Sequence, residues 1–109
     1  FRSNRLATAT ADPAVTTPVT LTGTRFGVDF NPAADRLRIV SDTGQNLRHN
    51  VNIGGVTLVD GALNNGAVPP VAVTGVASAA YTNNDLDANT ATTLFDIDSA
   101  LDQVVLHAS

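Results

Sequence analysis

The stretch that decides the fold is GVDFNPAADRLRIVSDTG, residues 27–44. Val28 and Phe30 alternate with Asp29, as in a strand with one buried face, and residues 31–35 have the composition of a turn. Residues 36–40 alternate again, with Leu37 and Ile39 on one face. A second turn follows at residues 42–44, where Gly44 can adopt a positive φ. The pattern predicts two antiparallel strands and a turn into a third.

The neighbouring segments extend this hairpin into a meander. We expect the third strand at residues 46–51 and, after Gly54 and Gly55, a fourth at residues 56–59, which completes a first unit over residues 25–61. Residues 1–24 are a Thr/Pro-rich lead with further strands predicted at 5–10 and 19–22. Residues 62–75 contain Asn64-Asn65-Gly66 and Pro69-Pro70, and are interpreted as the connection to a second unit.

The same order of strands and turns recurs after this connection. A strand ending at Tyr81 corresponds to the one ending at Phe30, and residues 94–98 correspond to residues 38–42. With a third strand at residues 103–107, the second unit spans residues 76–109 and lacks its fourth strand. We therefore predict an all-β fold of two blade-like antiparallel meanders of a propeller-type repeat in one domain. A single β-sandwich or a strongly bent sheet is the alternative.

Composition supports strands and excludes some partners. Thr occurs 14 times and Val 13 times, whereas Lys, Glu and Met are absent. A net charge of −4, with six scattered arginines, argues against a nucleic-acid partner. Every apolar run is too short for a membrane span. Because the chain starts at Phe1 without a Met, we expect an exported protein, periplasmic or extracellular, or an excised part of a longer parent. Two blades cannot close a propeller, which predicts self-association through open sheet edges or a missing parent segment.

Three stretches together resemble an exported bacterial family that is catalogued only as a domain of unknown function. They are residues 27–48, the DGAL at residues 60–63 and residues 80–106. The resemblance implies propeller-type β repeats and brings no catalytic residues. The family's domain is usually longer and continues past the last strand, so the resemblance implies a truncated or minimal version here.

An oxygen-rich loop is the sharpest candidate for a metal site. Side chains at alternate positions between residues 83 and 90 could converge on a hard cation, and calcium prefers six to eight oxygens. The predicted ligands are Asp85, Asp87, Asn89, Thr93 and Asp96, with the carbonyl of Ala91. Thr90 stands where such a loop needs Gly, and Asp96 replaces the usual Glu. The alternative is an Asx-rich turn that satisfies its own backbone.

His49 and His107 are the candidate catalytic residues, because each falls on the third strand of its unit. Beside a bound calcium, an imidazole could activate water while the metal polarised an ester or lactone carbonyl. The alternative is that both are surface histidines. Asp42 and Asp98 lie at matching turns and are a weaker carboxylate pair. We expect no serine-hydrolase triad and no nucleotide cofactor, since the motifs for both are missing.

Two functions follow from these residues. The first is a calcium-assisted hydrolase of lactones or esters, by analogy with lactonases on propeller folds. The second is a non-catalytic extracellular binding or structural module. For the core, we predict that the apolar faces of the strands pack inward, and that Ile39→Asp costs several kcal/mol. The predicted core is Val28, Phe30, Leu37, Ile39, Phe95 and Ile97.

Overall fold

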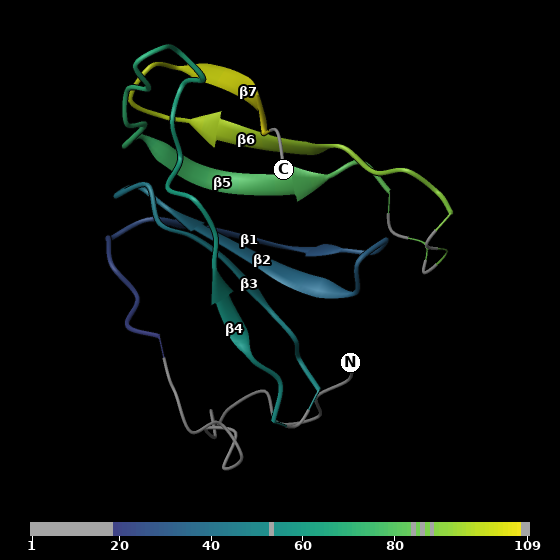
Figure 1. Cartoon of the computed structure of the whole chain (residues 1–109). Coiled ribbons are helices and arrows are strands. Elements are labelled where there is room, and N and C mark those ends of the chain that lie inside the picture. The colour runs from purple at the N-terminus through teal and green to yellow at the C-terminus, as the bar shows by residue number, and fades with distance from the viewer. Residues whose placement is uncertain (1–18, 53, 84, 86, 88, 108–109) are drawn as a thin grey trace.

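The computed structural model describes residues 19–52, 54–83, 85, 87 and 89–107, and in these residues it is all-β. Seven strands form two antiparallel sheets (Figure 1). The strands are β1 (Phe26–Asn31), β2 (Arg36–Ser41), β3 (Asn46–His49), β4 (Thr57–Val59), β5 (Val76–Tyr81), β6 (Leu94–Asp98) and β7 (Gln103–His107). The fold class is as predicted: a four-stranded meander followed by a three-stranded one, neither closed into a barrel.

The first sheet has the order β1-β2-β3-β4 and follows the predicted turns. Asn31 Oδ1 accepts hydrogen bonds from the amides of Ala33 and Ala34 in the β1–β2 turn. Gly44, in the β2–β3 turn, has a φ of 86°, which confirms the positive φ expected there. β3 ends at His49, two residues earlier than predicted.

The second sheet has the order β5-β6-β7 and repeats the pairing of the first. Phe30 pairs with Leu37, and Leu37 with His49. In the same way Tyr81 pairs with Leu94, and Leu94 with His107. Leu94 is therefore the counterpart of Leu37, and the sequence alignment that matched it to Arg38 was wrong by one residue. A shift of register between Val76 and Ser78 in β5 adds a further irregularity that the sequence does not reveal.

The two sheets pack face to face along β1 and β5, with β2 also against β5, and they diverge toward β4 and β7 (Figure 1). We call the facing surfaces the inner faces and the opposite surfaces the outer faces. A Cβ built on Gly27 would lie 2.5 Å from backbone atoms of Ser78 and Ala79, so only Gly lets the strands approach this closely. The apolar cluster between the sheets consists of Val40, Val76, Ala79 and Leu94, flanked by Leu63, Val73 and Tyr81.

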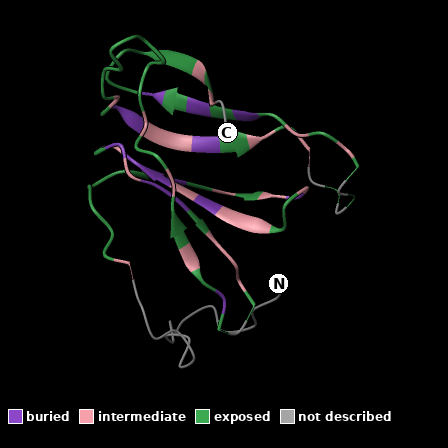
Figure 2. Cartoon of the chain, viewed as in Figure 1, coloured by how far each residue is buried: buried purple, intermediate pink, exposed green. Residues whose placement is uncertain are grey.

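The predicted core was assigned to the wrong face of each sheet. Val28, Phe30, Phe95 and Ile97 lie on the outer faces and are 40–53% exposed. Along β6, buried and exposed residues alternate (Figure 2). Leu37 and Ile39 are partly buried on the outer face of the first sheet. The inner faces instead bury polar side chains, including Arg38, Asn46, Asp96 and Asp98. Alternation divides the residues of a strand between two faces, but it does not tell which face meets the other sheet.

Outside the sheets, residues 19–22 are not a strand. They lie beside the β2–β3 turn, where Gln45 Nε2 donates to the carbonyl of Thr20 and Gln45 Oε1 accepts from the amide of Thr22. The strand predicted at residues 5–10 lies outside the described residues. In the part of the chain that the structure describes, no helix is long and apolar enough to cross a membrane.

Candidate functional site

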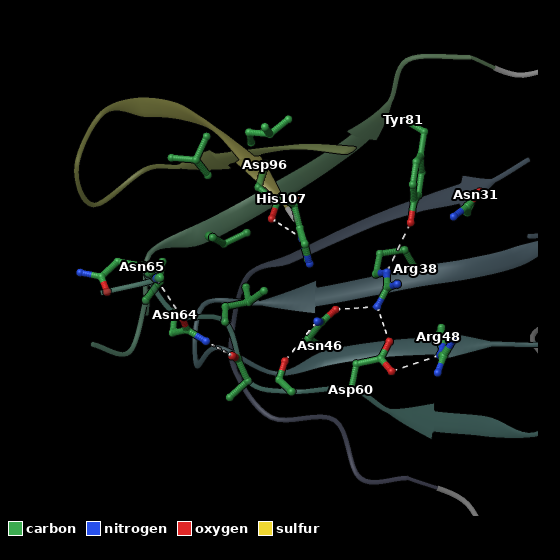
Figure 3. A pocket seen from close by; sticks show the side chains of 18 of the residues that line it. Asn31, Arg38, Asn46, Arg48, Asp60, Asn64, Asn65, Tyr81, Asp96 and His107 are labelled. Carbon is green, nitrogen blue, oxygen red and sulfur yellow. Dashed lines mark hydrogen bonds and ion pairs between the residues drawn. The ribbon is translucent and has the colours of Figure 1, made fainter. Parts of the chain in front are cut away.

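A cleft of about 950 Å³ opens between the inner faces where the sheets diverge (Figure 3). Its floor is the start of the connection between the sheets, residues 60–66. The first sheet contributes Arg36, Arg38, Asn46 and Arg48, and the second sheet contributes Tyr81, Asp96, Val105 and His107. The cleft therefore has one strongly polar wall and one wall with both polar and apolar side chains. Ligand pockets commonly combine apolar lining with a few polar groups that point toward the ligand.

Arg38 is held in place by groups from three segments of the chain (Figure 3). Its Nη1 donates to Asn46 Oδ1 at 2.8 Å and to Asp60 Oδ2 at 2.6 Å, and its Nε lies 3.4 Å from the Tyr81 hydroxyl. Asp60 also pairs with Arg48, whose Nε is 3.1 Å from Asp60 Oδ1. Among the described residues, no hydrogen bond of Arg38 Nη2 is found, so this nitrogen can donate to a ligand oxygen.

The charge of Arg38 is secure although the residue is only 7% exposed. Burial by itself would lower its pKa, but the hydrogen bonds with Tyr81 and Asp60 outweigh burial, and the pKa lies above its ordinary value. Arg38 is thus a fixed, permanently charged guanidinium in the wall of the cleft.

Asp96 and His107 form the most buried polar pair of the opposite wall. Asp96 Oδ2 lies 2.7 Å from His107 Nδ1, and the side chains are 3% and 6% exposed. Because a carboxylate accepts hydrogen bonds, His107 Nδ1 is the donor of this bond, and the other ring nitrogen, Nε2, points into the cleft in Figure 3. The other carboxylate oxygen, Oδ1 of Asp96, is buried and has no hydrogen-bond partner among the described residues.

The cleft is positive within an acidic chain. Its lining includes three arginines and two aspartates, so that it carries one net positive charge with His107 neutral. The whole chain has a net charge of −4. The local sign favours a ligand with carboxylate or carbonyl oxygens over a cation.

The two predicted catalytic histidines occupy equivalent positions but have different surroundings. His49 lies on the outer face of the first sheet, where its Nδ1 is 2.9 Å from Thr57 Oγ1, and it does not line the cleft. His107, its counterpart in the second sheet, lines the cleft and contacts Asp96. The structure therefore does not bring the two histidines together.

The five predicted calcium ligands are divided between two places. Asp85, Asp87 and Asn89 are exposed in the β5–β6 loop, where Asp85 Oδ1 accepts from the amide of Asp87 and Asp87 Oδ1 accepts from that of Asn89. Thr93, at the end of the loop, donates its amide to Thr82 Oγ1. Asp96 turns inward to His107. Among the described residues, no three acidic or histidine side chains form a group that could hold a metal ion.

Asp42 and Asp98 also have separate partners. Asp42 accepts from the amide and hydroxyl of Thr24, and these two bonds lower its pKa. Asp98 Oδ1 accepts from the amides of Ala100 and Leu101, as a turn residue does. Neither lines the cleft, so the carboxylate pair considered from the sequence is not present there.

Four residues of the site were not predicted from the sequence: Arg38, Arg48, Asp60 and Tyr81. Arg38 was placed on the face opposite Leu37 and Ile39, which is correct, but that face is the buried one. Asp60 follows directly after the predicted fourth strand, residues 56–59, and was given no role. The available signal was the alternation of arginines at residues 36, 38 and 48, which lie on one face across β2 and β3.

A family model described as a domain of unknown function, DUF4394, matches residues 3–109. The chain belongs to this family. The DUF4394 match spans both sheets and the connection between them, so the cleft lies wholly within the family domain. Searches of curated proteins and of solved structures found no match to the chain. The description of DUF4394 names no activity, and export stays a prediction.

Proposed function

We propose that the cleft binds a small acid rich in hydroxyl groups, such as a sugar acid or its lactone. The observation that carries this proposal is that hydrogen-bond donors of the first sheet and polar groups of the second sheet face each other across one cleft. The first sheet offers the Nη2 of Arg38 and the half-exposed Arg48 to a carboxylate or carbonyl. The second sheet lines the opposite wall with Tyr81, Asp96 and His107, whose oxygen and ring-nitrogen atoms can pair with hydroxyl groups of a ligand.

Binding is supported by the rigidity of these groups. Arg38 and Arg48 share Asp60, and Arg38 also contacts Asn46 and Tyr81, so little side-chain entropy remains to be lost on binding. The second oxygen of Asp96 is fixed because the first is bonded to His107. A ligand that carries both oxygens and hydroxyls satisfies both walls, whereas a neutral apolar molecule satisfies neither.

Hydrolysis of a bound lactone or ester is a second candidate function, favoured by the Asp96–His107 pair. Asp96 would orient the imidazole through Nδ1, and Nε2 would take a proton from a water molecule as it attacks the carbonyl. Arg38 would stabilise the oxyanion that forms. The proton then passes to the leaving oxygen, which releases a carboxylic acid and an alcohol.

Calcium has no part in this proposal. The loop oxygens of Asp85 and Asp87 accept from backbone amides, and Asp96 faces the cleft with His107. The calcium site predicted from the sequence therefore stays a prediction. The effect of added calcium on the Tm tests it.

The test is calorimetric titration with galacturonate, with neutral galactose as the matched ligand. We expect galacturonate to bind and galactose to bind at least tenfold more weakly. Arg48→Gln should weaken binding at least tenfold, since one charge-assisted hydrogen bond contributes about 1.5–3 kcal/mol. Arg25→Gln is the control, because Arg25 is exposed and does not line the cleft. Equal binding of both sugars, or equal losses in both variants, contradicts the proposal.

Hydrolysis is tested separately with a sugar lactone and a simple ester. Turnover in the wild type that falls at least a hundredfold in His107→Gln, with galacturonate binding retained, would establish His107 as the base. Binding without any turnover leaves the domain as a binding module and rejects the hydrolase.

A further inference from the structure

The two sheets repeat the same strand pairing, so each surface of one sheet has a counterpart on the other sheet. One such surface is covered in the second sheet, whereas its counterpart in the first sheet is exposed. By strand pairing, Val76, Ala79 and Tyr81 on the inner face of β5 correspond to Phe26, Val28 and Phe30 on the outer face of β1. Val76 and Ala79 are 1% and 9% exposed, because they pack against the first sheet. Their counterparts Phe26 and Val28 are 36% and 53% exposed.

The second sheet has the complementary open surface. On the inner face of the first sheet, Gly27 and Asp29 meet β5, and their counterparts on the outer face of the second sheet are Ser78 and Ala80. Gly27, Ser78 and Ala80 are small, so a small residue lies at the contacting strand in both cases. Around them the outer face is apolar and 40–68% exposed, with Phe95, Ile97, Val104 and Leu106.

These two open faces carry no arginine or aspartate at their paired positions, and His49 lies at the edge of the first. The net charge of −4 therefore does not oppose their contact directly. Leu47, also on the outer face of the first sheet, is only 1% exposed, so the open part of that face lies at β1. Exposed apolar patches of this kind mark interaction sites.

We propose that the outer face of the second sheet in one copy of this chain packs on the outer face of β1 in a second copy. The contact repeats, between copies, the relation that the two sheets already have within one copy. Ala80 of one copy then lies against Phe30 of the next, as Asp29 lies against Tyr81 within the chain. The interface is head-to-tail, because the two surfaces differ, and such an interface can add further copies or close into a ring.

The first experiment measures mass by light scattering and sedimentation from low micromolar to near-millimolar protein. We expect species larger than the monomer that grow with concentration. Phe95→Arg removes one surface and Val28→Arg removes the other, so each variant alone should stay monomeric. An equimolar mixture should form heterodimers, since each variant keeps the surface that the other lacks. Val68→Arg, in the exposed connection, is the matched control and should associate like the wild type.

The outcomes distinguish a head-to-tail contact from other arrangements. A wild type that is monomeric at all concentrations overturns the proposal. Association that Val28→Arg abolishes and Phe95→Arg leaves intact indicates a symmetric contact between two β1 faces, and also overturns it. Circular dichroism of each variant checks that the sheets are folded, so that a loss of association is not a loss of structure.

A cross-link supplies the register of the contact. The chain has no cysteine, so Ala80→Cys and Phe30→Cys can be made singly in a clean background. Under oxidation, the mixture of the two variants should give a disulfide-linked dimer in higher yield than either variant alone. Equal yields in the three samples would contradict the proposed register.

Discussion

The carboxylate of Asp29 accepts a hydrogen bond from the backbone N–H of Tyr81, with Oδ2 and N 2.7 Å apart, and so joins the two sheets. Its other oxygen, Oδ1, accepts from the N–H of Phe30 at 2.9 Å. β1 and β5 are both edge strands, and one side chain satisfies an amide on each.

Asp29→Ala should therefore lower the free energy of unfolding by about 1.5–3 kcal/mol, the usual contribution of a hydrogen bond to a charged group. Asp29→Asn keeps one acceptor oxygen and should lose about half as much. Urea denaturation measures both variants. If the two substitutions cost the same, the oxygen that Asn keeps supports neither of the two hydrogen bonds, which contradicts the prediction.

Gly27 sets the closest approach between the sheets, which can be tested against a second glycine. Gly27→Ala places a methyl group 2.5 Å from the backbone of Ser78 and Ala79, and should destabilise the fold by about 1–3 kcal/mol through overpacking. A Cβ at Gly61 meets nothing within 4 Å, so Gly61→Ala should leave the Tm nearly unchanged. Equal melting shifts in the two variants would show that β1 and β5 are not in contact.

The reversal of the core faces predicts opposite results for two apolar residues. Val40 is fully buried between the sheets, and Val40→Asp should destabilise by several kcal/mol, because it buries an unpaired charge. Ile97 is 48% exposed, and Ile97→Asp should cost about 1 kcal/mol or less when measured at low micromolar concentration. If Ile97→Asp destabilised the protein more than Val40→Asp, the result would support the core predicted from alternation alone.

Asp42 gives the fold an acid-sensitive contact. The amide of Thr24, and then its hydroxyl, lower the pKa of Asp42 below the ordinary 3.8, so the ionised form stabilises the folded state. That contribution is present above 3.8 and is lost as the pH falls through the lower folded pKa. Asp42→Asn should melt below the wild type near neutrality, and the gap should close toward pH ~2. A gap that is independent of pH would assign the difference to packing.

Calcium titration tests the loop between β5 and β6. Asp85 and Asp87 already accept bonds from backbone amides, and we expect millimolar calcium to leave the Tm unchanged in the wild type and in Asp85→Ala. A rise in Tm that Asp85→Ala abolishes and a chelator reverses would instead support the calcium loop predicted from the sequence.

Local pattern predicted the strands because turns and alternation are properties of neighbouring residues. The Asn31 turn, the positive φ of Gly44 and the strands around them are all visible in a few residues of sequence. The side of each sheet that becomes buried is decided by residues far apart, such as Gly27 against Ser78. Arg38 lies on the face opposite the predicted core residues Leu37 and Ile39, and that face is the one that is buried with Asp60 and Tyr81.

The candidate site was predicted only in part, for the same reason. His107 and Asp96 were both selected, but for different sites, and their contact across β6 and β7 depends on a register that the sequence repeat misaligned by one residue. Arg48 and Asp60 are 12 residues apart and meet only because β3 and the residue after β4 lie side by side. Pairs of this kind are properties of the folded sheet.

The sheets contact each other at β1 and β5 and diverge toward β4 and β7, so the contact between β1 and β5 can act as a hinge. A small rotation of one sheet about this hinge would change the width of the cleft while leaving the hydrogen bonds within each sheet intact. Because Asp29 and Gly27 lie at the hinge, a substitution of either residue would alter the affinity of the cleft for a ligand without changing any side chain that lines it.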